Sequence, residues 1–291
     1  MHSAGLPRNP GCDHGIFAPR ATRRLPLMSP HRPRKRFGQN FLRAPHVVAQ
    51  IVAAANLAPG DRVMEIGPGM GALTGELLAA GAEVLACEVD RDLAEALHRR
   101  GETRLHVHLG DVLKADWPEL LAEPPYKLVA NLPYNISSQV VFRILDHRHL
   151  FSRLVLMFQK EVGERLLAAP GTRDYGILSV LVQNWYTVGR VARVAPGCFF
   201  PPPKVESVVL RFDPRPQPLA PVADEAAFRQ LVKAVFAQRR KTLRNGLLGA
   251  GYEAEDVDRA LAACVLAPTV RGETLTITQM ARLADELSNF N

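Results

Sequence analysis

The fold is decided by the stretch Glu65-Ile66-Gly67-Pro68-Gly69-Met70-Gly71, which joins the short apolar segment 63–67 to a segment of helical spacing that runs to about residue 80. Glycines at such a strand-to-helix turn let the backbone approach a ligand closely, and the N-terminus of the helix supplies amide donors. The turn therefore predicts a nucleotide site beside the first strand of an α/β sheet. By themselves the glycines are also compatible with a dinucleotide site, with Ala72 at the last small position, or with a structural turn.

Strand-like and helical patterns alternate outward from this turn. We predict strands at 63–67, 83–88, 105–109, 127–131, 153–158, 188–194 and 206–212, and further helices at 47–57, 91–100, 137–147 and 176–186. The alternation predicts a parallel sheet wound on both faces, whose last two strands pair as a closing hairpin.

Two segments suggest domain boundaries. Residues 1–27 are rich in Pro, Gly and Arg without apolar periodicity, so we expect a disordered leader or an over-long start, with Met28 as the true beginning. The segment 213–221 contains four prolines, which resist helix and strand, and we predict a semi-rigid linker at 214–221. We therefore expect a catalytic domain over 28–213 and a small helical domain over 222–291.

The formal net charge of +7 is unevenly distributed. Residues 1–43 carry nine Arg or Lys against the single acid Asp13, and six cations without an acid lie between Glu225 and Glu253. Two basic patches on an otherwise nearly neutral chain favour a polyanionic partner that is contacted at defined places. The alternative is a solvated charged surface without a partner.

The composition argues against several classes of protein. No apolar run reaches the ~18 residues that a membrane-spanning helix needs, so we expect no membrane contact and a cytoplasmic location. The four cysteines (Cys12, Cys87, Cys198 and Cys264) lie far apart and form no CxxC pair. This spacing argues against a zinc site or a disulfide framework, and we expect no metal.

Acidic residues follow the next two strands. Glu88 ends the second strand, 21 residues after Gly67, where a carboxylate can accept hydrogen bonds from ribose hydroxyls. Gly110-Asp111 follows the third strand, where a carboxylate can hold the exocyclic amine of an adenine. These residues predict an adenosine-containing cofactor. S-adenosylmethionine fits better than NAD, because the sequence shows no second nucleotide-binding half.

The fourth strand ends in Asn131-Leu132-Pro133-Tyr134, at the edge of the sheet where open α/β folds bind ligands. The N6 lone pair of adenine is delocalised into the ring and is a poor nucleophile. The Asn131 side-chain oxygen and the carbonyl of Leu132 or Pro133 can accept its two N–H groups and aim the lone pair at a methyl group. Tyr134 is expected to stack on the base. The alternative is a proline turn without chemistry.

A second aromatic position comes from the stretch Phe199-Phe200-Pro201-Pro202-Pro203-Lys204-Val205, in which three prolines predict an extended loop. A phenylalanine on this loop can face Tyr134 across a flipped-out adenine. We expect one of Phe199 and Phe200 to be a core residue.

Further motifs stand in order with these: KRFGQNFL (35–42), QKEV (159–162), FFPPPKVES (199–207) and QRRKTLRN (238–245). Over roughly 34–290 the chain resembles the ribosomal RNA adenine dimethyltransferase A family, whose relatives are the Erm resistance methylases and the mitochondrial transcription factor B proteins. The resemblance implies an α/β class I S-adenosylmethionine-dependent methyltransferase fold (Rossmann-like, mostly parallel seven-stranded sheet) with a small C-terminal all-α domain. It also implies transfer of methyl groups from S-adenosyl-L-methionine to N6 of two adjacent adenosines in a hairpin loop near the 3′ end of small-subunit (16S) rRNA, during ribosome biogenesis.

The resemblance implies roles for single residues. Tyr134 and Phe199 would sandwich the target base, and Asn131 would hold both cofactor and target amine, with Pro133 in the same catalytic set. Asn40 and Leu42 would close over the cofactor. The full cofactor set is Gln39, Asn40, Leu42, Glu65, Gly67, Gly69, Glu88, Asp111 and Asn131.

A basic stripe is predicted in the C-terminal part. Apolar residues from Phe228 to Phe236 follow helical spacing, and on one continuous helix Arg229, Lys233, Arg240 and Arg244 would fall within about 60° of arc. We expect this stripe to bind RNA phosphates. The expected RNA-binding residues are Arg229, Lys233, Arg239, Arg240, Lys241 and Arg244.

Three other functions share parts of this pattern. An NAD-dependent oxidoreductase would use the same scaffold and bind NADH rather than S-adenosylhomocysteine. A DNA adenine-N6 methylase would prefer Asp at position 131, and a non-catalytic assembly or transcription factor would keep the fold without turnover. The small ribosomal subunit is the expected partner. We expect a monomer, because no unmatched apolar helix is visible.

Overall fold

The computed structural model describes residues 33–34 and 38–288. The expectations for residues 1–27 and for Met28 lie outside the described residues, as do positions 35–37 of the N-terminal motif. No helix of the described ranges is long and apolar enough to cross a bilayer.

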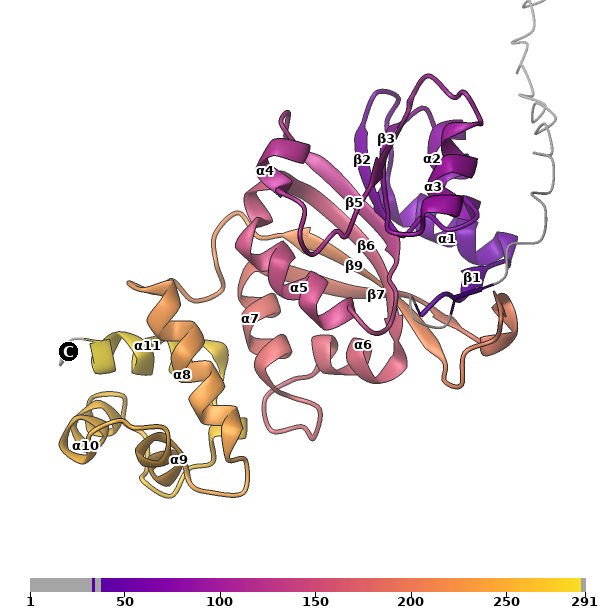
Figure 1. Ribbon diagram of the computed structural model, residues 1–291. Coiled ribbons are helices and arrows are strands. Elements are labelled where there is room, and N and C mark those ends of the chain that lie inside the picture. Colours follow the sequence, from indigo (N-terminus) through magenta and orange to yellow (C-terminus); the bar gives the residue numbers. More distant parts are fainter. Residues whose placement is uncertain (1–32, 35–37, 289–291) are drawn as a thin grey trace, which may run out of the picture. The chain divides into compact units, whose positions relative to one another are not determined.

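A seven-stranded sheet forms the centre of the α/β part (Figure 1), with the strand order β4-β3-β2-β5-β6-β9-β7. Strands β2 to β6 are mutually parallel, whereas β9 pairs antiparallel with β6 and β7. The strands are β2 (Arg62–Ile66), β3 (Glu83–Glu88), β4 (Leu105–Leu109), β5 (Tyr126–Asn131), β6 (Phe151–Gln159), β7 (Tyr186–Val194) and β9 (Ser207–Pro214). The predicted mostly parallel sheet and its closing antiparallel pair are confirmed.

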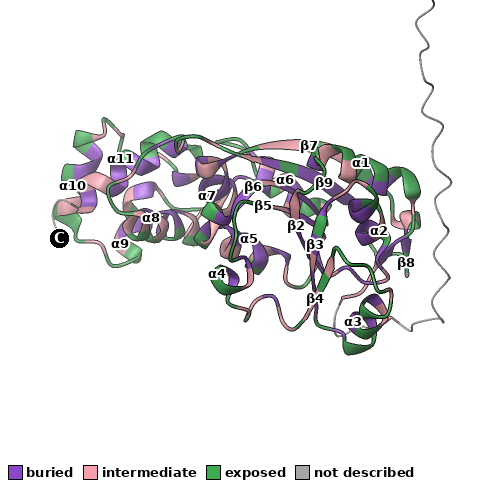
Figure 2. Ribbon diagram, turned by 90° about the horizontal axis from the view of Figure 1, so that it is seen from above, coloured by how far each residue is buried: buried purple, intermediate pink, exposed green. Residues whose placement is uncertain are grey.

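Helices cover both faces of this sheet. On one face, α1 (Pro45–Ala55) and α2 (Ala72–Ala79) pack against strand residues such as Val129 and Val155. On the other face, helices of the 117–185 segment pack against the alternate residues, for example Leu128. Neighbouring residues of one strand therefore belong to different cores, as expected for strands that are buried on both sides. Figure 2 shows buried strands between helices whose outer sides are exposed. The remaining helices of this part are α3 (Arg91–His98), α4 (Trp117–Leu120), α5 (Ser137–Asp146), α6 (Lys160–Leu167) and α7 (Ile177–Trp185).

A short antiparallel ribbon, which the sequence analysis did not predict, lies apart from the main sheet. It consists of β1 (Phe41–Leu42) and β8 (Phe199–Phe200), with Phe41 opposite Phe200 and Leu42 opposite Phe199. The N–H of Arg43 extends the pairing by donating to the carbonyl of Cys198 at 2.8 Å. The ribbon therefore joins the N-terminal motif to the proline-rich loop.

The predicted linker is tied to the C-terminal end of α7. The N–H of Arg215 donates to the carbonyl of Trp185 at 2.8 Å, and the N–H of Leu219 donates to the carbonyl of Asn184 at the same distance. The buried Asn184 side chain also accepts the N–H of Ala220 at 2.9 Å. These hydrogen bonds hold the segment against the α/β part, so it does not behave as a free spacer.

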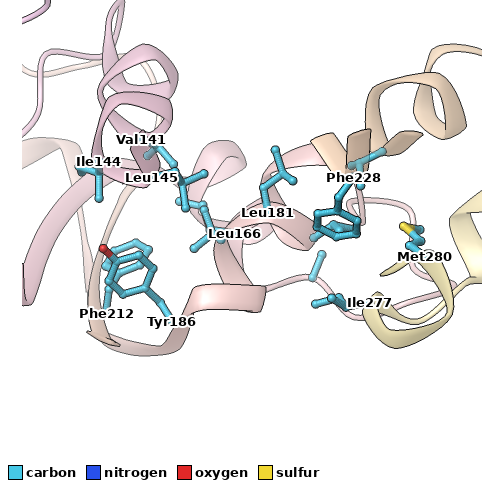
Figure 3. Close-up of a cluster of buried hydrophobic side chains, with 14 of the residues drawn as sticks. Val141, Ile144, Leu145, Leu166, Leu181, Tyr186, Phe212, Phe228, Ile277 and Met280 are labelled. Atoms are coloured by element: carbon cyan, nitrogen blue, oxygen red, sulfur yellow. The ribbon is translucent and has the colours of Figure 1, made fainter. Parts of the chain in front are cut away.

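Beyond the linker, the described chain contains only helical elements. They are α8 (Glu225–Ala237), α9 (Leu243–Gly249), α10 (Ala254–Ala263), the 3-10 turn η4 (Gly272–Thr274) and α11 (Ile277–Ser288). One hydrophobic core continues from the sheet through Leu166 and Leu181 to Phe228, Ile277 and Met280 (Figure 3). The helical part is therefore packed onto the α/β part through shared apolar contacts.

The prediction of one continuous helix carrying the basic stripe is wrong. Helix α8 ends at Ala237, and α9 begins at Leu243 after the N-cap Thr242, whose hydroxyl accepts the N–H of Asn245. Because residues 238–242 form a break, Arg240 and Arg244 do not extend the helical face of Arg229 and Lys233. The sequence signal was Thr242, a residue that favours a new helix start.

Candidate active site

A cavity of about 250 Å³ opens at the carboxyl ends of β2, β3 and β5. Its wall includes every residue that the sequence analysis assigned to cofactor binding, from Gln39 to Asn131. Of the predicted catalytic residues, Asn131, Pro133 and Tyr134 also line it, whereas Phe199 does not. The N-terminal motif, the glycine-rich turn and the strand end at 131–134 therefore converge on a single site. No cluster of three or more potential metal ligands occurs among the residues that the structure describes.

The glycine-rich turn forms the floor of this cavity. Gly67 and Gly69 have φ angles of 67° and 58°, which L side chains rarely adopt. A Cβ on Gly69 would lie 2.9 Å from the ring of Phe41, so only glycine lets the 38–42 segment close over the turn. Phe41 had no predicted role, although it stands between the predicted cofactor residues Asn40 and Leu42.

Glu88 is fixed at the cavity edge by two main-chain donors. One carboxylate oxygen accepts the N–H of Gly69 at 3.1 Å, and the other accepts the N–H of Asp90 at 2.9 Å. Burial raises the pKa of Glu88, and the two N–H donors partly oppose that shift. Each carboxylate oxygen has a second lone pair, so both remain able to accept hydrogen bonds from ligand hydroxyls.

Glu65 lies deeper, with 1% of its surface exposed. Burial raises its pKa to about 7, although the Thr74 hydroxyl donates to it at 2.7 Å and Arg100 lies near enough to favour the charge. The Arg100 guanidinium also donates to the carbonyl of Met70 at 2.7 Å and braces the glycine-rich turn from outside the cavity. No spacing or motif in the sequence connects Arg100 to the turn, so its role was not predicted.

The segment that covers the cavity is fastened to the loop after β3. Gln39 donates to one oxygen of the buried Asp90 carboxylate at 3.1 Å, and Arg34 donates to the other at 2.8 Å. Asp111, which also lines the cavity, accepts the N–H of Leu113 at 2.9 Å. Gln39 and Asp111, both predicted to bind the cofactor, are therefore held in place by hydrogen bonds within the protein.

Asn131 ends β5, and its side-chain amide donates to the carbonyl of Asn40 at 3.0 Å. Because a carbonyl oxygen only accepts, this contact fixes the orientation of the amide and leaves Oδ1 as the accepting atom. Pro133 already accepts the N–H of Ile136 at 3.1 Å, whereas no donor from the described residues reaches the carbonyl of Leu132. Of the two carbonyls considered from the sequence, that of Leu132 keeps both lone pairs for a ligand, whereas that of Pro133 keeps one.

Tyr134 is held at the cavity wall by two hydrogen bonds, one to its side-chain hydroxyl and one to its main-chain carbonyl. Its hydroxyl lies 2.5 Å from the hydroxyl of Ser207, and its carbonyl accepts a hydrogen bond from Ser137 at 3.2 Å. Burial raises the pKa of Tyr134, so the phenol stays neutral at physiological pH. The ring therefore offers an uncharged, anchored aromatic surface.

The two phenylalanines of the proline-rich loop have different surroundings. Phe199 is 4% exposed and packs with Leu42 in the core. It is therefore the core phenylalanine that was expected at one of these two positions. Phe200 is 43% exposed, and the guanidinium of Arg43 lies 4.1 Å from its ring centre. A stacking role for Phe199 therefore requires the ribbon to shift when RNA binds.

The six predicted RNA-binding cations divide into two groups. Lys233, Arg240 and Lys241 are exposed and have no ion pair with the described residues. The other three form ion pairs: Arg229 with Asp146 and Glu225, Arg239 with Glu273, and Arg244 with Asp258. Arg239 and Arg240 also line a groove of about 910 Å³ together with Arg165, Arg173 and Arg271.

Solved structures with the same architecture include a dimethyladenosine transferase from Plasmodium falciparum, with a TM-score of 0.72, 28% identity, and coverage of 84% of this chain and 95% of that one. The 23S rRNA methyltransferase ErmE is also similar, with a TM-score of 0.63, 28% identity, and coverage of 86% and 100%. Together with the glycine-rich turn and the Asn131–Tyr134 strand end, this likeness defines a class I methyltransferase with a C-terminal helical region.

The family is defined by sequence. A family model described as "Ribosomal RNA adenine dimethylase" matches residues 30–289, so the chain belongs to this family. A Syntrophotalea carbinolica protein named "Ribosomal RNA small subunit methyltransferase A" is 60% identical over 254 residues, which are 87% of this chain and 96% of that protein. A Geobacter metallireducens protein of the same name is 49% identical, with coverage of 87% and 94%. The resemblance seen in the sequence is confirmed, and a methyltransferase is favoured over the oxidoreductase alternative.

Proposed function

We propose that the protein transfers methyl groups from S-adenosylmethionine to N6 of two adjacent adenosines in a hairpin loop near the 3′ end of small-subunit (16S) rRNA, giving N6,N6-dimethyladenosine. The names of the similar proteins support the substrate, and the cavity supports the chemistry. The observation that carries the proposal is the orientation of Asn131, whose Oδ1 is left free to accept a hydrogen bond.

The cavity wall fits an adenosyl cofactor. Glu88 would accept the ribose hydroxyls, because both of its oxygens keep a free lone pair, and Asp111 would accept the adenine amine. Gly67 and Gly69 leave room for close approach of the backbone, and Gln39, Asn40 and Leu42 would cover the ligand from the N-terminal side. When bound, S-adenosylmethionine supplies an electrophilic methyl carbon.

The strand end after β5 would orient the acceptor amine. Asn131 Oδ1 would accept one N–H of adenine N6, and the carbonyl of Leu132 would accept the other. The two hydrogen bonds favour a tetrahedral nitrogen whose lone pair points into the cavity. Positioning of this kind contributes on the order of 7–11 kcal/mol at best. No strong base is required, because the proton leaves after the nitrogen has become cationic.

The target base would stack on Tyr134, whose ring is anchored through Ser207 and Ser137. Such a contact contributes about 1–3 kcal/mol per base. Phe199 would supply the second face after a shift of the β1–β8 ribbon. The basic residues of the C-terminal part would contact RNA phosphates, above all Lys233, Arg240 and Lys241, which have no ion pair within the described ranges.

The test is an Asn131→Ala variant, incubated with labelled methyl donor and undermethylated small ribosomal subunits, followed by nucleoside analysis. The wild-type protein should yield N6,N6-dimethyladenosine, and the variant should bind RNA but transfer no methyl group. Full activity in the variant would contradict the proposed mechanism. Wild-type transfer to duplex DNA alone would favour a DNA methylase, and RNA binding without any transfer would favour an assembly factor.

A further inference from the structure

Arg43 and Phe200 form a cation–π pair on the surface beside the cavity. The guanidinium carbon of Arg43 lies 4.1 Å from the centre of the Phe200 ring, and Phe200 is 43% exposed. Arg43 makes no ion pair with any residue that the structure describes. Its N–H is bonded to Cys198 at 2.8 Å, so both side chains belong to the same two-stranded ribbon. Among the described residues no acid compensates the charge of Arg43, which is held over an aromatic ring.

The position of this pair relative to the cavity follows from the ribbon register. Phe200 is directly opposite Phe41, and side chains of directly opposed residues lie on the same face of a ribbon. Phe41 lines the cavity. The loop that begins at Phe200 ends at Ser207, whose hydroxyl contacts that of the cavity residue Tyr134. Both ends of residues 200–207 thus meet the cavity wall.

The charge of this loop favours an anionic partner. Lys204 is exposed without an ion pair to the described residues, whereas the only acid of the loop, Glu206, is neutralised by Lys160 at 2.7 Å. Val205, 45% exposed, adds apolar surface. A single exposed phenylalanine is ordinary on a protein surface. An exposed ring with a stacked guanidinium, beside uncompensated positive charge, matches the way in which proteins hold single-stranded nucleotides.

We propose that the Arg43–Phe200 pair binds the unpaired nucleotide adjacent to the target adenosine. The base of this nucleotide stacks on the pair, and the guanidinium of Arg43 contacts its phosphate. Turning the target adenosine into the cavity removes a stacking partner from its neighbour, so a surface that stacks the neighbour stabilises the flipped arrangement. This inference rests on the proposed function and adds a second base-binding position outside the cavity.

The test compares Phe200 variants on two hairpin RNAs that differ only in the nucleotide beside the acceptor adenosine, which is intact in one and abasic in the other. With intact RNA, Phe200→Ala should lower kcat/KM for transfer by roughly tenfold, in line with the loss of one stacked base. For the wild-type protein, kcat/KM should be lower by a similar factor on the abasic RNA than on the intact RNA. For Phe200→Ala, kcat/KM should be nearly the same on the two RNAs. Phe200→Trp should retain most of the wild-type rate, and Arg43→Gln should weaken RNA binding at low salt.

Two controls separate the possible outcomes. Leu219→Ala removes a comparably exposed apolar side chain, 49% exposed, from the linker and should behave as wild type. Titration with S-adenosylhomocysteine should give the same affinity for Phe200→Ala as for wild type, which shows that the cofactor site is intact. Two results would show that the inference is wrong while the proposed function stands, provided that wild type methylates RNA. In one, Phe200→Ala has no effect on kcat/KM. In the other, the losses in kcat/KM from Phe200→Ala and from the abasic RNA multiply when the two are combined. If wild type methylates no adenosine in RNA, both are wrong.

Discussion

The side-chain amide of Asn131 donates a hydrogen bond to the main-chain carbonyl of Asn40, with 3.0 Å between the two atoms, although the residues are 91 positions apart in the chain. Asn131 ends a central strand, and Asn40 belongs to the segment that covers the cavity. Closure of this segment and orientation of the accepting oxygen are therefore linked. If the segment that contains Asn40 moves away, the Asn131 amide loses this hydrogen bond, and its nitrogen and oxygen can exchange positions.

This link predicts the effect of Asn131→Asp. A carboxylate cannot donate to Asn40, so it would face the carbonyl oxygen without a hydrogen bond and turn away from the acceptor position. We expect single-turnover transfer to fall about 100-fold, the typical cost of a misplaced reacting group. Asn56→Asp, at the exposed end of α1, adds the same charge and should leave the rate unchanged. A wild-type rate in Asn131→Asp would show that the contact with Asn40 is not needed.

Much of the α/β part could be predicted because its signals are local. Strand β2 is an apolar run that ends in a glycine turn, and the position of Asn131 at the end of a parallel strand follows from the alternation of elements. The β1–β8 ribbon could not be predicted, since each strand has two residues and the pairing joins segments that are far apart in sequence. The bracing by Arg100 also depends on tertiary contact alone. Burial of Phe199 rather than Phe200 likewise follows from register, which the sequence does not encode locally.

Gly71 and Arg100 should be energetically coupled. Gly71 has a φ of 79°, and a Cβ there would lie 2.5 Å from the Arg100 guanidinium. Gly71→Ala should therefore cost about 1 kcal/mol for the left-handed conformation and further free energy because Arg100 must move away from Met70. In an Arg100→Ala background only the first cost remains, so we expect a coupling of about 1 kcal/mol in urea unfolding. Additive effects within about 0.3 kcal/mol would contradict the packing described for Arg100.

Glu65 should make the folded protein less stable as pH rises. Burial raises its pKa to about 7 from the ordinary value of 4.5, so between these pH values the folded state holds a proton that the unfolded state has lost. The free energy of unfolding should therefore decrease from about pH 4.5 to about pH 7, by on the order of 3 kcal/mol. Glu65→Gln removes this contribution while keeping an acceptor for Thr74. Denaturant unfolding at pH 5 and pH 8 should show a stability gain for the variant that is larger at pH 8.

A matched control for the Glu65 prediction is Glu76→Gln, on the exposed side of α2. It should leave the pH dependence of unfolding close to that of wild type. If Glu65→Gln gave the same difference from wild type at both pH values, the carboxyl would not be titrating in this range, and its burial would not control stability.

The division of the C-terminal cations predicts two different responses to salt. Lys233, Arg240 and Lys241 have no ion pair with the described residues, so RNA phosphates would be their partners and would release counterions on binding. Replacing all three with Gln should make the slope of log affinity against log salt concentration less steep by about 2. Each lost phosphate contact with single-stranded RNA accounts for roughly 0.7 of this change.

The control for this prediction is the triple replacement of Arg229, Arg239 and Arg244 with Gln, which removes the same formal charge. These residues are already paired with acids, for example Arg244 with Asp258 at 2.6 Å. Their loss should leave the salt dependence closer to that of wild type and should lower stability only slightly, because ion pairs at an exposed surface are screened by solvent. Equal changes in salt dependence for the two triple variants would contradict the division into paired and unpaired cations. In that case the ion pairs must open when RNA binds, and all six cations predicted from the sequence would contact phosphates.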